Sequence, residues 1–121
     1  MENSKTCYGI TYFDEEDLKE TQINHRVELE YYKTNKCAED DFKYGIEIRK
    51  KEYINDRITI ETNNIQNITN SSDKVIEIIN TLKKYKVTPI GLNDVLEDLL
   101  RVNWEERGRY KILFFNWNLW E

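Results

Sequence analysis

The sequence predicts an α+β fold, in which an antiparallel sheet of three to four strands precedes two amphipathic helices packed on one face and a C-terminal strand. Between residues 6 and 65, apolar and polar residues alternate in short runs, which is typical of strands with one buried face. Between residues 71 and 100, apolar residues recur at helical spacing in two stripes. The 121 residues include only four glycines and one proline, so we expect a single domain without long irregular linkers.

The strands are expected to form a meander, because short polar turns separate them. The four runs span residues 6–13, 26–33, 42–53 and 57–65. Residues 14–20 are a charge run, which is typical of a solvated loop or a short helical turn. Residues 66–70 are polar and are expected to link the sheet to the helices.

The alternation also predicts which side chains face the core. In the second run, three residues share the expected buried face: Val27, Leu29 and Tyr31. In the fourth run, Ile58 and Ile60 are expected to point into the core, and three polar residues are expected to point outward or pair across the sheet: Thr59, Glu61 and Asn63. Gly45 inside the third run suggests a bulge or a close approach of two backbones.

Both helices have clear boundary signals. Ser71 or Ser72 can cap the first helix, and its apolar stripe consists of Val75, Ile78, Ile79 and Leu82. Pro89 ends it, because proline lacks an N–H group and disfavours a helical residue before it. Thr88 can cap the second helix, with Asn93 as a later start. The second stripe consists of Leu92, Val95, Leu96, Leu99 and Leu100.

Composition and charge narrow the class of protein. The net charge of -5 makes non-specific binding to nucleic acid or to an anionic membrane less favourable. No leader of the secretory type and no apolar run of about 20 residues is present, so the sequence predicts a cytoplasmic protein without a membrane span. Cys7 and Cys37 are expected to be reduced there, and their spacing does not show whether they lie close together.

Residues 101–121 differ in character from the preceding part and form a basic and aromatic tail. Residues 112–120 are the most apolar stretch of the chain and are expected to form a strand at the sheet edge or over the core. Such an edge strand could also pair with a second copy, so the sequence leaves open a homodimer through the C-terminal strand.

Two blocks carry a resemblance to a known group of proteins. One is Tyr44-Gly45-Ile46-Glu47-Ile48, and the other runs from residue 87 to residue 100, VTPIGLNDVLEDLL. With Asn67-Ile68-Thr69 before the first helix, they resemble a bacterial domain-of-unknown-function family of short proteins, over roughly residues 26–100. The resemblance implies the meander and the two helices. It implies no activity, cofactor or catalytic residue.

Candidate residues for catalysis or metal binding are few. His25 is the only histidine, and neither cysteine has CxxC spacing, so no zinc site is predicted. His25 is better interpreted as a surface or strand-edge residue than as a general base. The sequence therefore predicts a protein that is not an enzyme and has no cofactor.

The first function hypothesis is a protein-interaction or regulatory module. Three carboxylates lie on neighbouring turns of the second helix: Asp94, Glu97 and Asp98. A solvated acidic face is the simpler interpretation, and a docking face for an unknown basic protein partner is the functional one. Trp117 and Trp120 are candidate partner-binding residues in the tail.

The alternative hypothesis is a binder of single-stranded nucleic acid or of a small ligand. It uses basic and aromatic residues of the tail, which could contact phosphates and stack on bases: Arg107, Arg109, Lys111 and Trp117. Nucleic acid is the less favoured partner, because the chain is acidic overall.

Overall fold

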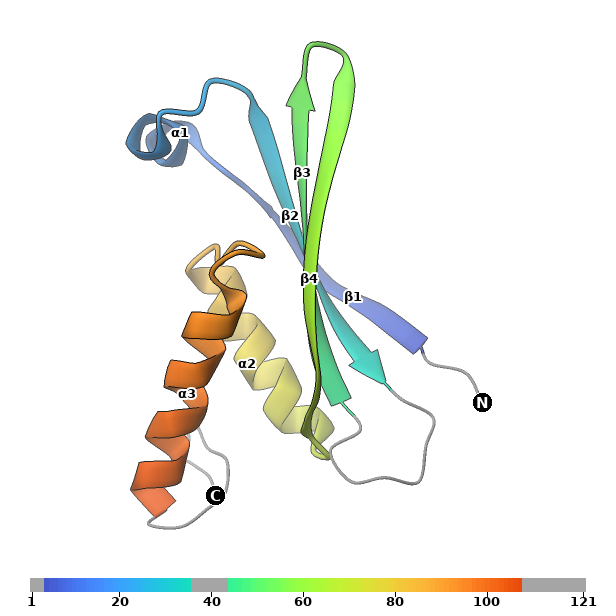
Figure 1. Ribbon diagram of the computed structural model, residues 1–121, viewed down its shortest axis with the longest axis vertical. Coiled ribbons are helices and arrows are strands. Elements are labelled where there is room, and N and C mark those ends of the chain that lie inside the picture. The colour runs from blue at the N-terminus through green and yellow to red at the C-terminus, as the bar shows by residue number, and fades with distance from the viewer. Residues whose placement is uncertain (1–3, 36–43, 108–121) are drawn as a thin grey trace.

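The computed structural model describes residues 4–35 and 44–107, with side chains as far as residue 100. Four antiparallel strands form one sheet in the order β1-β2-β3-β4, and helices α2 and α3 lie together on one side of it (Figure 1). The elements are β1 (Ser4–Tyr12), α1 (Glu15–Thr21), β2 (Arg26–Asn35), β3 (Tyr44–Ile54), β4 (Arg57–Thr69), α2 (Ser72–Lys84) and α3 (Leu92–Arg107). The predicted α+β class and the antiparallel meander are confirmed.

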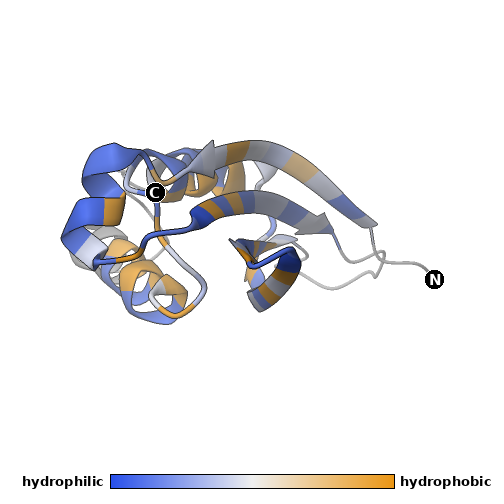
Figure 2. Ribbon diagram, turned by 90° about the horizontal axis from the view of Figure 1, so that it is seen from above, coloured by the Kyte–Doolittle hydropathy of each residue, from blue (hydrophilic) through white to orange (hydrophobic). Residues whose placement is uncertain are grey.

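The core lies between the sheet and α2. Val27, Leu29 and Tyr31 of β2 are fully buried, as predicted. The predicted α2 stripe is fully buried as well: Val75, Ile78, Ile79 and Leu82. Seen from above, hydrophobic and hydrophilic residues alternate along the strands (Figure 2). The Tyr31 hydroxyl donates a hydrogen bond of 2.9 Å to the carbonyl oxygen of Val87, which ties the sheet to the connection between α2 and α3.

The charge run at residues 14–20 forms the short helix α1, one of the two predicted outcomes. Asp14 and Asp17 form a capping box, in which each side chain accepts a hydrogen bond from the backbone N–H of the other, at 2.9 Å. Lys86, after α2, pairs with Asp17 and Asp14. The hydrogen bond from Lys86 lowers the pKa of Asp17. The two ion pairs connect α1 to the residues that follow α2.

Three predicted boundaries differ from the structure. The expected linker at 66–70 is wrong, because β4 continues to Thr69 through a left-handed residue, Asn67, with a φ of 60°. The second helix begins at Leu92, after a turn in which the Gly91 N–H donates to the Thr88 carbonyl oxygen. This helix also continues past residue 100 to Arg107. The predicted C-terminal strand at 112–120 lies outside the described residues.

The predicted orientation of Ile58 and Ile60 is wrong. Their exposed fractions are 57% and 55%. A two-residue turn with positive φ at Asn55 and Asp56 pairs Tyr53 with Ile58 and Lys51 with Ile60. Directly paired residues share a face of the sheet, and Tyr53 and Lys51 face away from the helices. In addition, the β3–β4 hairpin projects past the ends of α2 and α3 (Figure 1).

The same register places the three polar residues of β4 that were predicted to point outward on the face toward the helices: Thr59, Glu61 and Asn63. Asn63 pairs with Ile48, which is fully buried. Its side-chain amide donates hydrogen bonds of 2.9 Å to the Pro89 carbonyl oxygen and of 2.8 Å to Oδ1 of Asn93. Asn63 therefore connects β4 to the start of α3 rather than facing solvent.

The prediction of a close approach at Gly45 is confirmed. The register between β3 and β4 shifts between Tyr44 and Ile46. A Cβ atom at Gly45 would lie 2.4 Å from the backbone oxygen of Ile65, a distance that a rigid strand cannot relieve.

We expect Gly45→Ala to lower the free energy of unfolding by about 2 kcal/mol, because the added methyl group forces the two strands apart. Urea denaturation followed by circular dichroism measures this. Gly91→Ala is the matched control, since a Cβ atom there would meet nothing closer than 3.9 Å. Equal stability of the two variants would contradict the close approach.

Candidate functional site

The side of the sheet opposite α2 and α3 is a continuous surface to which all four strands contribute. We call it the outer face. The register of the strands places these residues on it: Ile10 and Tyr12 of β1; Arg26, Glu28, Glu30 and Tyr32 of β2; Glu47, Arg49, Lys51 and Tyr53 of β3; Ile58, Ile60, Thr62 and Asn64 of β4. No described helix covers it, because α2 packs on the opposite side (Figure 1).

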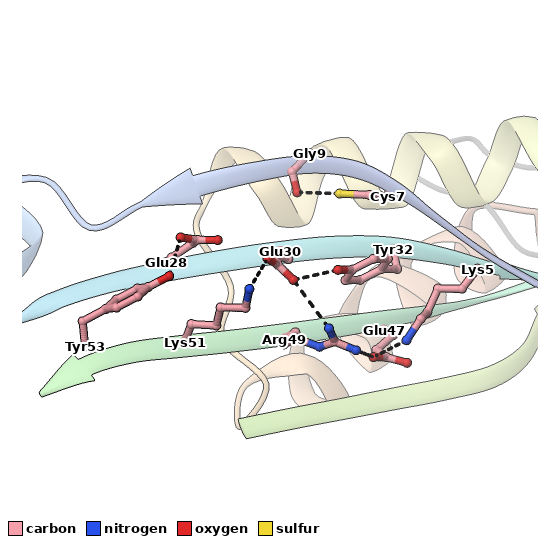
Figure 3. Close-up of polar contacts among 10 residues, drawn as sticks. All are labelled: Lys5, Cys7, Gly9, Glu28, Glu30, Tyr32, Glu47, Arg49, Lys51 and Tyr53. Atoms are coloured by element: carbon pink, nitrogen blue, oxygen red, sulfur yellow. Dashed lines mark hydrogen bonds and ion pairs between the residues drawn. The ribbon is translucent and has the colours of Figure 1, made fainter. Parts of the chain in front are cut away.

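Glu30 is the centre of a polar network in the middle of the outer face (Figure 3). The Tyr32 hydroxyl donates a hydrogen bond of 2.7 Å to one carboxylate oxygen. The Lys51 ammonium lies 3.0 Å from the other oxygen, and the Arg49 guanidinium lies 3.9 Å from the first. These long neighbours cover the carboxylate, so that Glu30 is buried although no helix lies above it.

The network continues along both central strands. Arg49 also contacts Glu47 at 3.4 Å, and Lys5 of β1 contacts the same Glu47 oxygen at 3.2 Å. Glu28 is buried too, and its carboxylate accepts a hydrogen bond of 3.1 Å from the Tyr53 hydroxyl. Glu28 and Glu30 of β2 thus lie beside Lys51 and Arg49 of β3, whereas Glu47, also of β3, lies between Arg49 and Lys5.

The contacts of Glu30 shift three pKa values. Burial raises the pKa of Glu30, but the hydrogen bonds from Tyr32 and Lys51 outweigh burial, so the pKa lies below its ordinary value. The hydrogen bond to Glu30, followed by burial, raises the pKa of Tyr32 to about 12. The hydrogen bond between the Lys51 ammonium and Glu30 raises the pKa of Lys51. All three groups therefore keep their ordinary charge states near neutral pH and serve as fixed contacts rather than as proton donors or acceptors.

Apolar residues flank this charged centre on the two edge strands. Ile10 and Tyr12 of β1 have exposed fractions of 49% and 46%, and Ile58 and Ile60 of β4 are exposed by more than half. Four of the six large exposed hydrophobic residues in the described part of the chain therefore lie on the outer face. The sequence analysis did not identify this cluster. Pairing the residues on the two sides of the Asn55-Asp56 turn would have placed Ile58 and Ile60 on the same face as Tyr53 and Lys51.

His25 has a partner that sequence reasoning did not identify. Its Nε2 atom lies 2.8 Å from a carboxylate oxygen of Glu52, and the other oxygen of Glu52 lies 3.0 Å from the Lys50 ammonium. The hydrogen bond from Lys50 is the main reason that the pKa of Glu52 is lowered. An open concavity beside His25 is lined by Phe13 and Leu18, among others. His25 lies directly before the first residue of β2, and its interpretation as a surface or strand-edge residue stays a prediction.

The three predicted acidic residues of the second helix, Asp94, Glu97 and Asp98, are all exposed on α3. In the part of the chain that the structure describes, no group of three or more His, Cys, Asp or Glu residues is placed to hold a metal ion. The acidic residues are thus accessible to a partner, and their binding role stays a prediction.

The predicted tail sites are not placed. Arg109, Lys111, Trp117 and Trp120 lie outside the described residues, and Arg107 is described only as the last residue of α3. Cys37 also lies outside them, so its distance from Cys7 is not given by the structure. Cys7 itself is exposed, and its thiol donates a weak hydrogen bond of 3.7 Å to the Gly9 carbonyl oxygen.

Comparison with known proteins identifies the family. Among residues 4–35 and 44–107, no helix is long and apolar enough to cross a bilayer. No curated protein and no solved structure matches the chain. Residues 10–102 match a family described as "Family of unknown function (DUF6514)". This match begins within β1, before the region of the resemblance noted above. The chain belongs to this family of unknown function, DUF6514.

Proposed function

We propose that this protein is a small, non-enzymatic interaction module that binds another protein through the outer face of its sheet. The observation that carries the proposal is the position of the exposed apolar residues. Ile10, Tyr12, Ile58 and Ile60 lie on the two edge strands of one uncovered face. Exposed apolar residues that gather on one surface and are bordered by polar groups are typical of protein-binding sites.

The pattern of the outer face describes the partner that it fits. Its margins are apolar, and its centre carries both signs of charge: Glu28 and Glu30 of β2 lie beside Lys51 and Arg49 of β3, and Glu47 also lies on β3. A matching surface must be apolar at its margins and must carry the opposite order of charges in its centre. We take this surface to be a protein rather than a nucleic acid, because the exposed apolar margins need an apolar counterpart that a phosphate backbone does not offer.

The acidic residues of α3 support a second contact in the same proposal. They lie on the helix side of the protein, opposite the outer face, so one chain could hold a basic partner there at the same time. The partner-binding role of Trp117 and Trp120 and the cytoplasmic location also belong to this proposal. Binding of single-stranded nucleic acid or of a small ligand by the tail is the alternative to it.

The test is affinity capture from cells that naturally contain the protein, followed by mass spectrometry. We expect Ile58→Lys and Ile60→Lys, introduced together, to abolish capture of the stoichiometric partner, because each ammonium group would need to lose water in an apolar contact. Ile90→Lys is the matched control: Ile90 is exposed by 77% and lies in the turn before α3, away from the outer face.

A third arm reverses the charges of Asp94, Glu97 and Asp98. Loss of a partner in this arm alone, together with sensitivity of the capture to salt, would assign that partner to the acidic face of α3. Equal capture by the native chain and the Ile58→Lys, Ile60→Lys variant would remove the outer face as the binding surface.

A further inference from the structure

We infer that the free edge of β4 pairs with the same edge of a second copy of this chain, in an antiparallel arrangement whose twofold axis passes between the two Thr59 residues. This inference goes beyond the proposed function, because it concerns the edge of the sheet and not its outer face. Two observations carry it: the direction of the backbone groups of β4, and the order of the side chains from residue 57 to residue 61.

Among the described strands, β4 pairs only with β3, so its other side is an edge of the sheet. The two turn residues between these strands both have positive φ, which is typical of a hairpin in which Ile54 and Arg57 form a hydrogen-bonded pair. Hydrogen-bonded and non-hydrogen-bonded pairs alternate along an antiparallel ladder. The backbone N–H and carbonyl groups of Ile58 and Ile60 therefore point away from β3, toward the free edge.

The opposite edge of the sheet is less suited to an added strand. The register of β1 shifts between Cys7 and Gly9, and the Tyr8 carbonyl oxygen accepts a hydrogen bond of 3.1 Å from the Lys83 ammonium. Such a bulge interrupts the row of backbone groups that an added strand needs. The register of β4 has no shift between residues 57 and 65, and this segment contains no proline. The edge of β4 is therefore a continuous template for another strand.

The side chains at the start of β4 indicate which strand this edge fits. The segment reads Arg57-Ile58-Thr59-Ile60-Glu61. When two copies pair antiparallel about Thr59, Arg57 lies opposite Glu61 of the second copy, and Ile58 lies opposite Ile60 of the second copy. The axis makes every pair occur twice. The segment thus complements itself in charge and in apolar side chains, and each pair of isoleucines can exchange two backbone hydrogen bonds.

Both charged residues of the segment are accessible to a second copy. Arg57 is exposed, and the side chain of Glu61 is exposed by 42%. The Lys50 ammonium lies 4.0 Å from Glu61 but 3.0 Å from Glu52, so its closer ion pair is with Glu52. The β3–β4 hairpin projects past the ends of α2 and α3, so these helices do not cover this end of the edge (Figure 1).

Neighbouring registers lose the match. A pair of strands centred on Ile60 places Glu61 opposite Thr59, and one centred on Ile58 places Arg57 opposite Thr59, so neither joins opposite charges. A pair centred on Glu61 places two carboxylates directly opposite each other, which is destabilising. The charges therefore select the register centred on Thr59. Because this contact is short and relies on backbone hydrogen bonds, we expect a reversible dimer that forms as the concentration rises.

Hydrogen exchange of the full chain, measured by NMR at low and high protein concentration, tests the pairing directly. The backbone amides of Ile58 and Ile60 should exchange without protection in the dilute chain and become protected as the concentration rises. The amides of Thr59 and Glu61 point toward β3 and should be protected at both concentrations. Sedimentation velocity over the same range should show a change from one to two chain masses.

Charge variants test the register. Arg57→Glu and Glu61→Arg, each alone, should raise the dissociation constant roughly tenfold, because each places two pairs of like charges across the interface. The double variant carries both changes, restores two pairs of opposite charges, and should dimerise like the native chain. Glu20→Arg, at an exposed position of α1, is the matched control for Glu61→Arg and should also dimerise like the native chain. Arg57 and Glu61 do not lie on the outer face, so capture of another protein through that face should not change.

Three outcomes overturn the inference. The first is a native chain that stays monomeric at every concentration, and capture of a different protein through the outer face would then leave the proposed function intact. The second is a dimer in which the amides of Ile58 and Ile60 stay unprotected, because such a dimer uses another surface. The third is a double charge variant that does not recover the dimer, because Arg57 and Glu61 of the two copies are then not opposite each other.

Discussion

Leu29→Ala is expected to lower the free energy of unfolding by about 3 kcal/mol, which is the largest effect that we expect from a single substitution here. Leu29 is fully buried in β2, in the cluster between the sheet and α2. Removing its side chain leaves a cavity, and the helix above it cannot fully collapse because its own apolar residues are held by other strands. Urea denaturation of dilute protein measures the change.

Ile60→Ala is the control that makes this result specific. Both positions are aliphatic residues within strands, but Ile60 lies on the outer face with 55% of its surface exposed. Its replacement should change the stability of the monomer by less than about 0.5 kcal/mol. A loss at Ile60 as large as the loss at Leu29 would mean that the hairpin register of β3 and β4 differs from the one described.

The second large effect is expected for Glu30→Gln, which should lower the free energy of unfolding at pH 7 by roughly 2 kcal/mol. The substitution keeps the size of the side chain but removes its charge. Lys51 and Arg49 lose their shared anion, and Tyr32 loses a charged acceptor at 2.7 Å. Because the carboxylate is buried, water does not replace these contacts in the folded chain.

The effect should depend on pH in a defined direction. The pKa of Glu30 lies below its ordinary value of 4.5 in the folded chain. Its contribution to stability is therefore fully present above pH 4.5 and is lost as the pH falls through the lowered value. The difference in stability between the native chain and Glu30→Gln should shrink over the same range. Glu20→Gln, at an exposed position of α1, should show no such difference. A constant difference from pH 7 to pH 3 would contradict the ionic role.

The strands and helices could be predicted from the sequence because their patterns are local. The period of two around Val27 and Leu29 and the stripe around Ile78 each identify an element and its buried face. The orientation of Ile58 could not be read from its own strand, because an alternating strand looks the same from either side. It depends on the partner strand and on the two-residue turn that sets the register.

The candidate site was harder to predict because its residues come from different strands. Glu28 and Glu30 lie on the face of β2 opposite Val27, Leu29 and Tyr31, but their burial depends on side chains of β3, which cover them. Asp94, Glu97 and Asp98 were easier to notice because they lie on a single helix. Local sequence patterns therefore identify candidate sites on helices more readily than candidate sites on sheets, whose residues come from several strands.

The contact between Asn63 and the start of α3 has a consequence for local unfolding. The stripe of α2 is fully buried, whereas in α3 only Leu92 and Leu96 are buried, and Val95, Leu99 and Leu100 are partly buried. The amide of Asn63 holds the first turn of α3 to the sheet. The part of α3 after Leu96 is therefore expected to open more easily than the sheet ladders. The slowest hydrogen exchange of backbone amides is then expected in the central strands. A partner that binds α3 can change the order of this helix without changing the order of the sheet.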